Sequence, residues 1–335
     1  MQRWSLALLL TALVAAPVPA AQAAQAAPPP QSPPFLAYLQ GRSPALIAFN
    51  PSRFDPRVPA SEPWPPASIA ADLAALRPAF DGLVLYDTRP DMTPGVVEAA
   101  VTHHFRAVLL GIWDPRSAAE IEAAAALVRR WDDRIAFAVV LGNEGINDNR
   151  YRIEDLAAAR ERLRALIGPG RPPLPVTTSE PAGDYGWPPL LAFGDFLAPN
   201  IHPALDREGL DAEAAVDWVR TRARAIATAA GRPVLIKETG MPHGGAPAFT
   251  PERQRAFWAA WLARGRLEPV STPPAASTGS GAVFVSAAAA FEAFDAPWKA
   301  DALHNPIEGR WGLMSIERTP YPSFAVWVDA RSGGR

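Results

Sequence analysis

The chain contains no cysteine among its 335 residues, so disulfide bonds, zinc–thiolate sites and a cysteine nucleophile are excluded. Lysine is almost as scarce, because Lys237 and Lys299 are the only two. The 32 basic residues are balanced by 34 acidic ones, which gives a net charge of −2. That balance argues against nucleic acid or an anionic membrane surface as the main partner.

What the chain does contain is typical of a soluble globular protein, with 49% apolar and 20% charged residues. A chain of this length can bury a core that needs no covalent staples. No stretch beyond the first segment is apolar enough to cross a bilayer. No GxGxxG turn occurs, which argues against an open sheet with a dinucleotide site.

The amino terminus has the pattern of a secretory signal peptide over residues 1–26. Arg3 gives it a basic start, an apolar stretch follows, and small residues near Ala20 form a cleavage site. Residues 27–40 begin APPPQSPP and are predicted to be a Pro-rich linker, followed by one folded domain over 41–335. We therefore expect an exported protein, periplasmic or extracellular, with no integral membrane span once the signal is removed.

After residue 40 the chain repeats one theme of a short apolar run, a loop and an alanine-rich amphipathic stretch. Ser117 with Glu120, and Thr250 before Pro251, are typical helix starts. Eight such units in one chain indicate an α/β fold, a single-domain (β/α)8 TIM barrel. The segment 268–281 is of low complexity and is predicted to be a surface loop. The predicted strands are Leu46–Asn50, Gly82–Tyr86, Ala107–Trp113, Ile135–Asn143, Pro175–Ser179, Phe196–His202, Val234–Glu238 and Ala282–Phe294.

In such a barrel the chemistry belongs at the carboxyl ends of the strands. Polar and aromatic residues follow most of the predicted strands, among them Tyr86, Trp113, Asn143, Glu180, Asn200, His202 and Glu292. Two carboxylates stand out, Glu144 after the fourth strand and Glu238 at the end of the seventh. A pair of acids on opposed sides of a barrel mouth can flank a glycosidic bond, one protonating the leaving oxygen and the other attacking the anomeric carbon.

These residues lie in strings that resemble glycoside hydrolase family 17, the family of β-1,3-glucanases and related β-glucan-acting enzymes. The strings are VLGNE at 140–144, VTTSE at 176–180, NIHP at 200–203, KETGMP at 237–242, FEAFDAPWK at 291–299 and WGL at 311–313. They occur in the family's order from about Leu46 to the last strand. The resemblance looks strongest to bacterial members.

The resemblance implies roles for individual residues. Glu144 matches the general acid/base and Glu238 the nucleophile of a retaining mechanism. Asn143 matches the residue that holds the sugar 2-hydroxyl, and Tyr86 a tyrosine near the nucleophile. Lys299 and Glu308 match a supporting network. With the strand-end residues and the loop tryptophans, the predicted substrate-binding set is Asn143, Tyr86, Trp113, Trp187, Glu180, Asn200, His202, Glu292, Trp298, Lys299 and Glu308.

Some of these assignments have a structural alternative. His202 either contacts sugar or is a satisfied structural histidine, and large aromatic residues are mostly buried. We expect Trp298 and Trp187 to be sugar platforms, and Trp218, Trp258, Trp261 and Trp327 to lie in the core. Strand alternation from Glu238 predicts that Lys237 points into the layer between sheet and helices.

Two departures from the family pattern limit the carry-over of roles. Ala296 stands where the family usually has an acid, so a network carboxylate is missing. Met241 stands where plant members usually have tryptophan, which changes one sugar-stacking platform. Neither departure affects Glu144 or Glu238.

The sequence therefore predicts a retaining glycoside hydrolase acting on β-glucan, β-1,3-linked by resemblance, through a covalent intermediate. Two alternatives stay open: a glucan glucosyltransferase with the same catalytic pair, and a non-catalytic carbohydrate-binding protein. The expected partner is a β-glucan polysaccharide or oligosaccharide, and the expected state is a monomer. No cofactor is expected and no metal-ligand cluster is evident in the sequence, where the five histidines are scattered.

Overall fold

The computed structural model describes residues 33–41, 43–58, 64–207, 209–265, 268–269, 283–285 and 288–333. All of them belong to one compact unit, Ser32–Arg335. The predicted signal peptide lies outside the described residues, as do most of the predicted linker and most of the 268–281 segment. No helix in the described ranges is long and apolar enough to cross a membrane.

The centre of the fold is a parallel sheet with the strand order β5-β4-β3-β2-β1-β8. Its longest pairing joins β3 and β4 over six residue pairs, from Ala107 opposite Ala136 to Ile112 opposite Leu141. The strands are β1 (Leu46–Ala48), β2 (Gly82–Val84), β3 (Ala107–Ile112), β4 (Ala136–Leu141), β5 (Val176–Thr177) and β8 (Ala289–Ala290).

Two further parallel segments join β5 to β8 through isolated bridges. Asn200 bridges both Pro181 and Glu238, and Thr239 bridges Ala290. The segments around Leu197 and Val234 are bonded in the same way. Eight parallel segments thus follow one another around a ring, which confirms the predicted (β/α)8 barrel.

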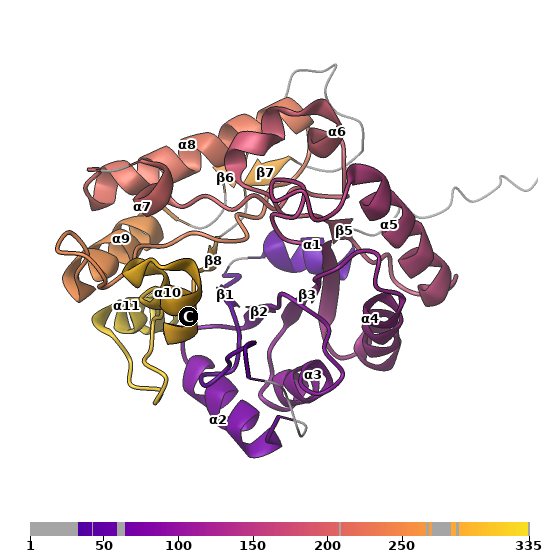
Figure 1. The fold of residues 1–335 in the computed structure, drawn as a ribbon, viewed down its shortest axis with the longest axis horizontal. Helices are drawn as coiled ribbons and strands as arrows, with labels where there is room; N and C mark the ends of the chain where they lie inside the picture. The colour runs from indigo at the N-terminus through magenta and orange to yellow at the C-terminus, as the bar shows by residue number, and fades with distance from the viewer. Residues whose placement is uncertain are drawn as a thin grey trace, which may run out of the picture. The chain divides into compact units, whose positions relative to one another are not determined.

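Helices surround this ring (Figure 1). The connections between strands contain α2 (Pro66–Leu76), α3 (Thr93–Thr102), α4 (Ala118–Trp131), α5 (Ile153–Ile167), η1 (Ala182–Gly186), α6 (Pro188–Leu191), α7 (Pro203–Asp206), α8 (Ala212–Ala230) and α9 (Pro251–Ala263). After β8 come α10 (Pro297–Leu303), η2 (Pro306–Gly309) and α11 (Pro322–Ser332). The predicted starts of α4 and α9 are confirmed, because Ser117 accepts from the Glu120 amide and Thr250 from the Arg253 amide.

The barrel interior is filled by alternate residues of the strands, as the period of two requires. Ala107 and Leu109 face inward from β3, Ala138 and Val140 from β4, and Leu235 from the seventh segment. The residues between them pack outward against the helices, where Trp258, Trp261 and Trp327 are fully buried as predicted and Trp218 is half-buried.

A short helix, α1 (Pro34–Leu39), packs against this interior at the amino-terminal ends of the strands. Phe35 and Leu39 are fully buried, and the Tyr38 hydroxyl donates to Asp81 Oδ1 at 2.8 Å. Residues 34–39 of the predicted 27–40 linker therefore form a helix of the fold, because the apolar side chains of FLAYL pack against the barrel.

The predicted eighth strand, Ala282–Phe294, is wrong in its extent. Within the described residues it contains β7 (Phe284–Val285) and β8, and the chain leaves the ladder after Ala290. β7 also pairs in antiparallel fashion with β6 (Glu268–Pro269), so the first two residues of the predicted 268–281 loop form a strand. An alanine-rich run fixes the place of a strand but not where it ends.

Candidate active site

Glu144 lies on a tight turn directly after β4. Gly142 has a φ of +74°, and a Cβ there would come within 1.8 Å of the Tyr151 hydroxyl, so this position requires glycine. The same hydroxyl accepts a hydrogen bond from the Gly145 amide at 3.1 Å. Glu144 itself has a φ of +54°, an uncommon conformation for a side chain of this size. The surrounding contacts must therefore hold the turn in place.

Glu180 is one of the residues that hold this turn. Its side chain is fully buried, and its two carboxylate oxygens accept from the amides of Ile146 at 3.1 Å and Asn147 at 3.2 Å. Burial raises its pKa to about 7, although the two amide bonds act to lower it. These contacts make Glu180 a support of the turn after Glu144, and its predicted contact with substrate stays a prediction.

Asn200 joins the fourth and sixth strand ends. Its Nδ2 donates to Glu144 Oε1 at 2.7 Å and to Asn143 Oδ1 at 3.1 Å. Its Oδ1 accepts from the Ser179 hydroxyl at 2.9 Å, which fixes the orientation of the amide. Asn200 is only 2% exposed, so in this structure it acts as a positioner of Glu144.

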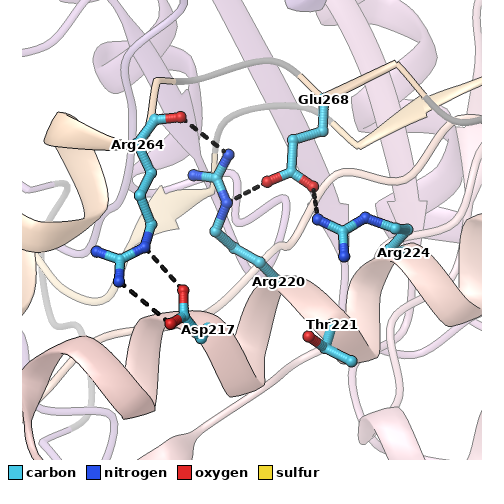
Figure 2. A pocket seen from close by; sticks show the side chains of 6 residues that line it. All are labelled: Asp217, Arg220, Thr221, Arg224, Arg264 and Glu268. Atoms are coloured by element: carbon cyan, nitrogen blue, oxygen red, sulfur yellow. Dashed lines mark hydrogen bonds and ion pairs between the residues drawn. The ribbon is translucent and has the colours of Figure 1, made fainter.

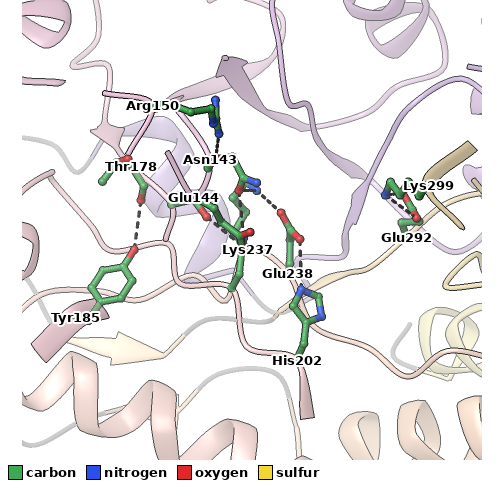
Figure 3. Close-up of polar contacts among 12 residues, drawn as sticks. Asn143, Glu144, Arg150, Thr178, Tyr185, His202, Lys237, Glu238, Glu292 and Lys299 are labelled. Atoms are coloured by element: carbon green, nitrogen blue, oxygen red, sulfur yellow. Dashed lines mark hydrogen bonds and ion pairs between the residues drawn. The ribbon is translucent and has the colours of Figure 1, made fainter. Parts of the chain in front are cut away.

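Lys237 contradicts its prediction from strand alternation. Its side chain is fully buried at the barrel mouth, and its Nζ donates to Asn143 Oδ1 at 2.7 Å and to Glu238 Oε1 at 2.5 Å (Figure 3). Leu235, two residues earlier, faces the barrel interior, and Lys237 follows the same alternation. The prediction used Glu238 as its inward reference, but Glu238 ends the strand and its carboxylate turns into the mouth.

Glu238 is 5% exposed and lies between Lys237 and His202. His202 Nε2 is 3.3 Å from Glu238 Oε2. Burial by itself would raise the pKa of Glu238, but the charge of Lys237 and the hydrogen bond from His202 outweigh it and lower the pKa well below the ordinary value. Glu238 is therefore held in its ionised form.

Glu144 has the opposite electrostatic setting. Burial and the nearby negative charge of Glu238 raise its pKa, against the Asn200 hydrogen bond and the charges of His202 and Lys237. The two carboxylates are thus driven apart in pKa, as a pair needs when one acts as an acid and the other as a nucleophile.

Tyr86, at the end of β2, lies near the predicted nucleophile as expected. Its ring covers the Lys237 ammonium, with Nζ 4.4 Å from the ring centroid. The hydroxyl is enclosed and has no hydrogen-bond partner among the described residues. Burial and the nearby charges of Glu238 and Glu292 raise its pKa, so the hydroxyl stays protonated beside Glu238.

Glu292, which is buried, forms a second ion pair with the half-buried Lys299 (Figure 3). Lys299 Nζ donates to both Glu292 oxygens, at 2.8 and 2.7 Å. Of the two residues expected in the supporting network, Lys299 thus pairs with Glu292, and Glu308 lies half-buried in η2.

The predicted sugar platforms differ in exposure. Trp113 is 44% exposed and Trp187 42% exposed, so both indole rings are open to solvent. The Arg150 guanidinium lies 4.3 Å from the Trp113 ring centroid, and the same side chain donates to the Asn143 carbonyl. Trp298 is half-buried and meets Phe54 edge-on with ring centroids 6.3 Å apart.

The two departures from the family pattern lie below the surface. Met241 is 1% exposed and packs in the core, so it offers no face to a sugar here. Ala296 is 8% exposed and directly precedes α10, where its side chain makes no capping hydrogen bond. Its neighbour Asp295 has its own partners, His243 Nε2 at 2.8 Å and the Tyr321 hydroxyl at 2.7 Å.

Neither a metal-binding cluster nor the hollow beside α8 offers a second ligand site among the described residues. No group of three or more metal-ligating side chains occurs among the described residues. A surface hollow of about 340 Å³ between α8 and α9 contains three arginines (Figure 2). All three are paired with acids there, Arg220 and Arg224 with Glu268 and Arg264 with Asp217, so the hollow offers no free cation.

Comparison with known proteins identifies a family for this chain. A family model described as the BtgE/BtgC glycoside hydrolase domain matches residues 47–312. Comparison with curated protein sequences finds no significant match.

Solved structures are similar in fold. A glycoside hydrolase family 17 β-1,3-glucanosyltransferase from Rhizomucor miehei is 18% identical with a TM-score of 0.63, covering 84% of this chain and 96% of that one. Its active-site mutant in complex with laminaritriose is 19% identical with the same TM-score and coverage. A GH5_18 protein from Bifidobacterium longum subsp. longum is 15% identical with a TM-score of 0.56, covering 87% of this chain and 78% of that one. The predicted family-17-like fold and the glycoside hydrolase resemblance are confirmed.

Proposed function

Because the chain belongs to the BtgE/BtgC glycoside hydrolase domain family, we propose that it is a retaining glycoside hydrolase acting on β-1,3-linked glucan. One observation carries the proposal: an ionised Glu238 and a protonatable Glu144 occupy the same barrel mouth, coupled through Asn143, Asn200 and Lys237. A protein that only binds carbohydrate has no need of two carboxylates with opposite pKa shifts.

The mechanism has two steps. Glu238 attacks the anomeric carbon while Glu144 gives its proton to the departing glycosidic oxygen, which leaves a glycosyl ester on Glu238 and a carboxylate at Glu144. Water then attacks the same carbon and gives its proton to Glu144. The ester bond breaks and its electron pair returns to Glu238, so the product has the configuration of the substrate.

Asn143 is the residue best placed to hold the sugar during these steps. Its Oδ1 accepts from both Lys237 and Asn200. Lysine can only donate, so it fixes which end of the Asn143 amide carries oxygen. The Asn143 NH2 group is then left to donate to a substrate hydroxyl.

Glucan transfer is a second candidate, since a sugar hydroxyl can replace water in the second step. It is favoured by the fold similarity to structures named as glucanosyltransferases. The exposed rings of Trp113 and Trp187 support binding of a glucan in either case, because indole faces can stack on sugar rings. We further propose export through the predicted signal peptide.

The test is incubation of the mature protein with linear β-1,3-gluco-oligosaccharides of one length, with products measured by mass. Shorter products alone support hydrolysis, and products longer than the substrate identify transfer. A Glu238→Gln variant, which keeps the size of the side chain, is the matched control and should give neither. Binding without any turnover by the wild type would contradict the proposal and favour a carbohydrate-binding protein.

A further inference from the structure

Lys237 is placed to act on the proposed nucleophile, and neither its residue type nor its neighbours are explained by folding alone. The ammonium is fully buried, and burying a charge is costly unless it is paired. Its partners are Glu238 Oε1 at 2.5 Å, Asn143 Oδ1 at 2.7 Å and the face of the Tyr86 ring. All three partners belong to the site, so the lysine is built into the reaction centre.

The charge balance of the site changes during the proposed reaction. In the resting protein the Lys237 ammonium is neutralised by the Glu238 carboxylate. Once Glu238 carries the sugar as an ester it is neutral, and Lys237 remains as a buried cation with only Asn143 and Tyr86 beside it. The negative charge of the site is then on Glu144, which has given up its proton.

We propose that Lys237 is a positioning residue that shortens the lifetime of the glycosyl-enzyme, an inference that rests on the proposed retaining function. Its charge disfavours the neutral ester and favours the carboxylate that is released. In the second step water adds to the anomeric carbon, Glu144 takes the proton, and the sugar–oxygen bond breaks with its electron pair returning to Glu238. Release of that carboxylate restores the pair with Lys237.

Lys237 also acts on the other catalytic carboxyl. Its charge favours ionised Glu144, which is the form that must accept the proton from water in the second step. The same ammonium therefore favours both the leaving group and the base of that step. Four other charged or titratable groups interact electrostatically with Glu238. They lie at the ends of the second, fourth, sixth and eighth strands and are, in that order, Tyr86, Glu144, His202 and Glu292.

The test uses the mature protein, a 2-deoxy-2-fluoro-β-laminaribioside with a dinitrophenyl leaving group, and the variant Lys237→Met. The fluorosugar forms a long-lived ester, and its breakdown is followed as recovery of activity after excess reagent is removed. We expect activity to recover at least about tenfold more slowly in Lys237→Met. Without the lysine charge the pKa of the Glu238 carboxyl rises by one or more units, which makes its carboxylate a poorer leaving group. The acid limb of kcat/KM should also move to higher pH in this variant.

Two further variants separate charge from structure. Lys237→Gln keeps a donor for Asn143 without the charge, so it should also be slow, and it serves if the methionine variant does not fold. Arg220→Met removes a buried cation of α8 that pairs with Glu268 of β6 and contacts none of the described site residues (Figure 2). It should lower thermal stability and leave the recovery rate and the pH profile unchanged.

The outcomes distinguish this inference from the function on which it rests. If the wild type is not labelled at Glu238, the proposed nucleophile is wrong. If it is labelled at Glu238, and both lysine variants recover at the wild-type rate with an unmoved acid limb, the role of Lys237 is refuted. Slow recovery with a shifted acid limb, absent in Arg220→Met, supports it.

Discussion

Glu180→Gln is expected to make the protein more stable and less active at alkaline pH. The side chain is fully buried, and its pKa is raised from 4.5 to about 7. Between those two values the folded protein binds a proton that the unfolded protein does not. The stability of the wild type therefore falls as pH rises through this interval, and it falls no further above it.

The magnitude follows from the width of the interval. Each pH unit is worth about 1.4 kcal/mol, so this one carboxyl lowers the free energy of unfolding by about 3 kcal/mol between acidic and alkaline pH. At pH 5, near the start of the interval, the variant should be more stable than the wild type by less than about 1 kcal/mol. At pH 8 the variant should be more stable by about 3 kcal/mol, a large part of the ~5–15 kcal/mol that is typical of a domain.

Activity should change in the opposite direction. The ionised carboxylate accepts from two amides of the turn after Glu144, whereas the glutamine carbonyl can accept from one and its NH2 opposes the other. The variant's kcat should therefore fall below that of the wild type as pH rises through about 7, with KM little changed. Urea unfolding at pH 5 and pH 8, together with kcat over the same range, measures both effects.

Glu120→Gln is the matched control, because Glu120 also accepts from loop amides, those of Thr88, Trp113 and Asp114. It should lower stability by about 1–3 kcal/mol at pH 8. Other buried carboxyls such as Glu292 also have a raised pKa, so the comparison is always with the wild type at the same pH. If Glu180→Gln shows the same slope of stability against pH as the wild type, the reasoning is refuted.

Four other changes have expected outcomes. Glu144→Gln should lose nearly all turnover of oligosaccharides. It should still be labelled by a dinitrophenyl glycoside, because that leaving group needs no acid. If both oligosaccharide turnover and dinitrophenol release are lost, the assignment of Glu144 as the acid is contradicted. Asn200→Ala removes the 2.7 Å bond to Glu144, so the alkaline limb of the pH–rate profile should move to higher pH, and an unmoved limb would argue against the contact. Tyr38→Phe leaves the buried Asp81 without its 2.8 Å donor, so the free energy of unfolding measured in urea should fall by about 1–3 kcal/mol while kcat stays unchanged. Lost activity would mean that α1 contributes to the site as well as to stability. Ala296→Glu should alter the rate or linkage preference on gluco-oligosaccharides, and no effect would place this position outside the working site.

The barrel and the meeting of Glu144 and Glu238 at its mouth could be predicted because both are carried by local patterns. β3 and β4 are continuous apolar runs, and the polar residues that follow them must meet at one end of a parallel barrel. Glu144 and Glu238 stand directly at such positions.

The support of that pair could not be predicted in the same way. The contact of Glu180 with amides 34 and 33 residues earlier depends on how two loops fold against each other. The orientation of Lys237 depends on where the strand ends. The alternation of inward and outward side chains continues to Lys237 and stops at Glu238. The sequence contains no signal for the inward positions of that segment, because Val234, Leu235 and Ile236 are all apolar and all fully buried.

The most direct test of the account is the configuration of the first product. Proton NMR at early time, with a linear β-1,3-gluco-oligosaccharide and enough enzyme to outrun mutarotation, reports the anomer released. The account predicts the β anomer first, with the α anomer growing in slowly by mutarotation. Initial release of the α anomer would contradict a nucleophilic Glu238 and the two-step mechanism built on it.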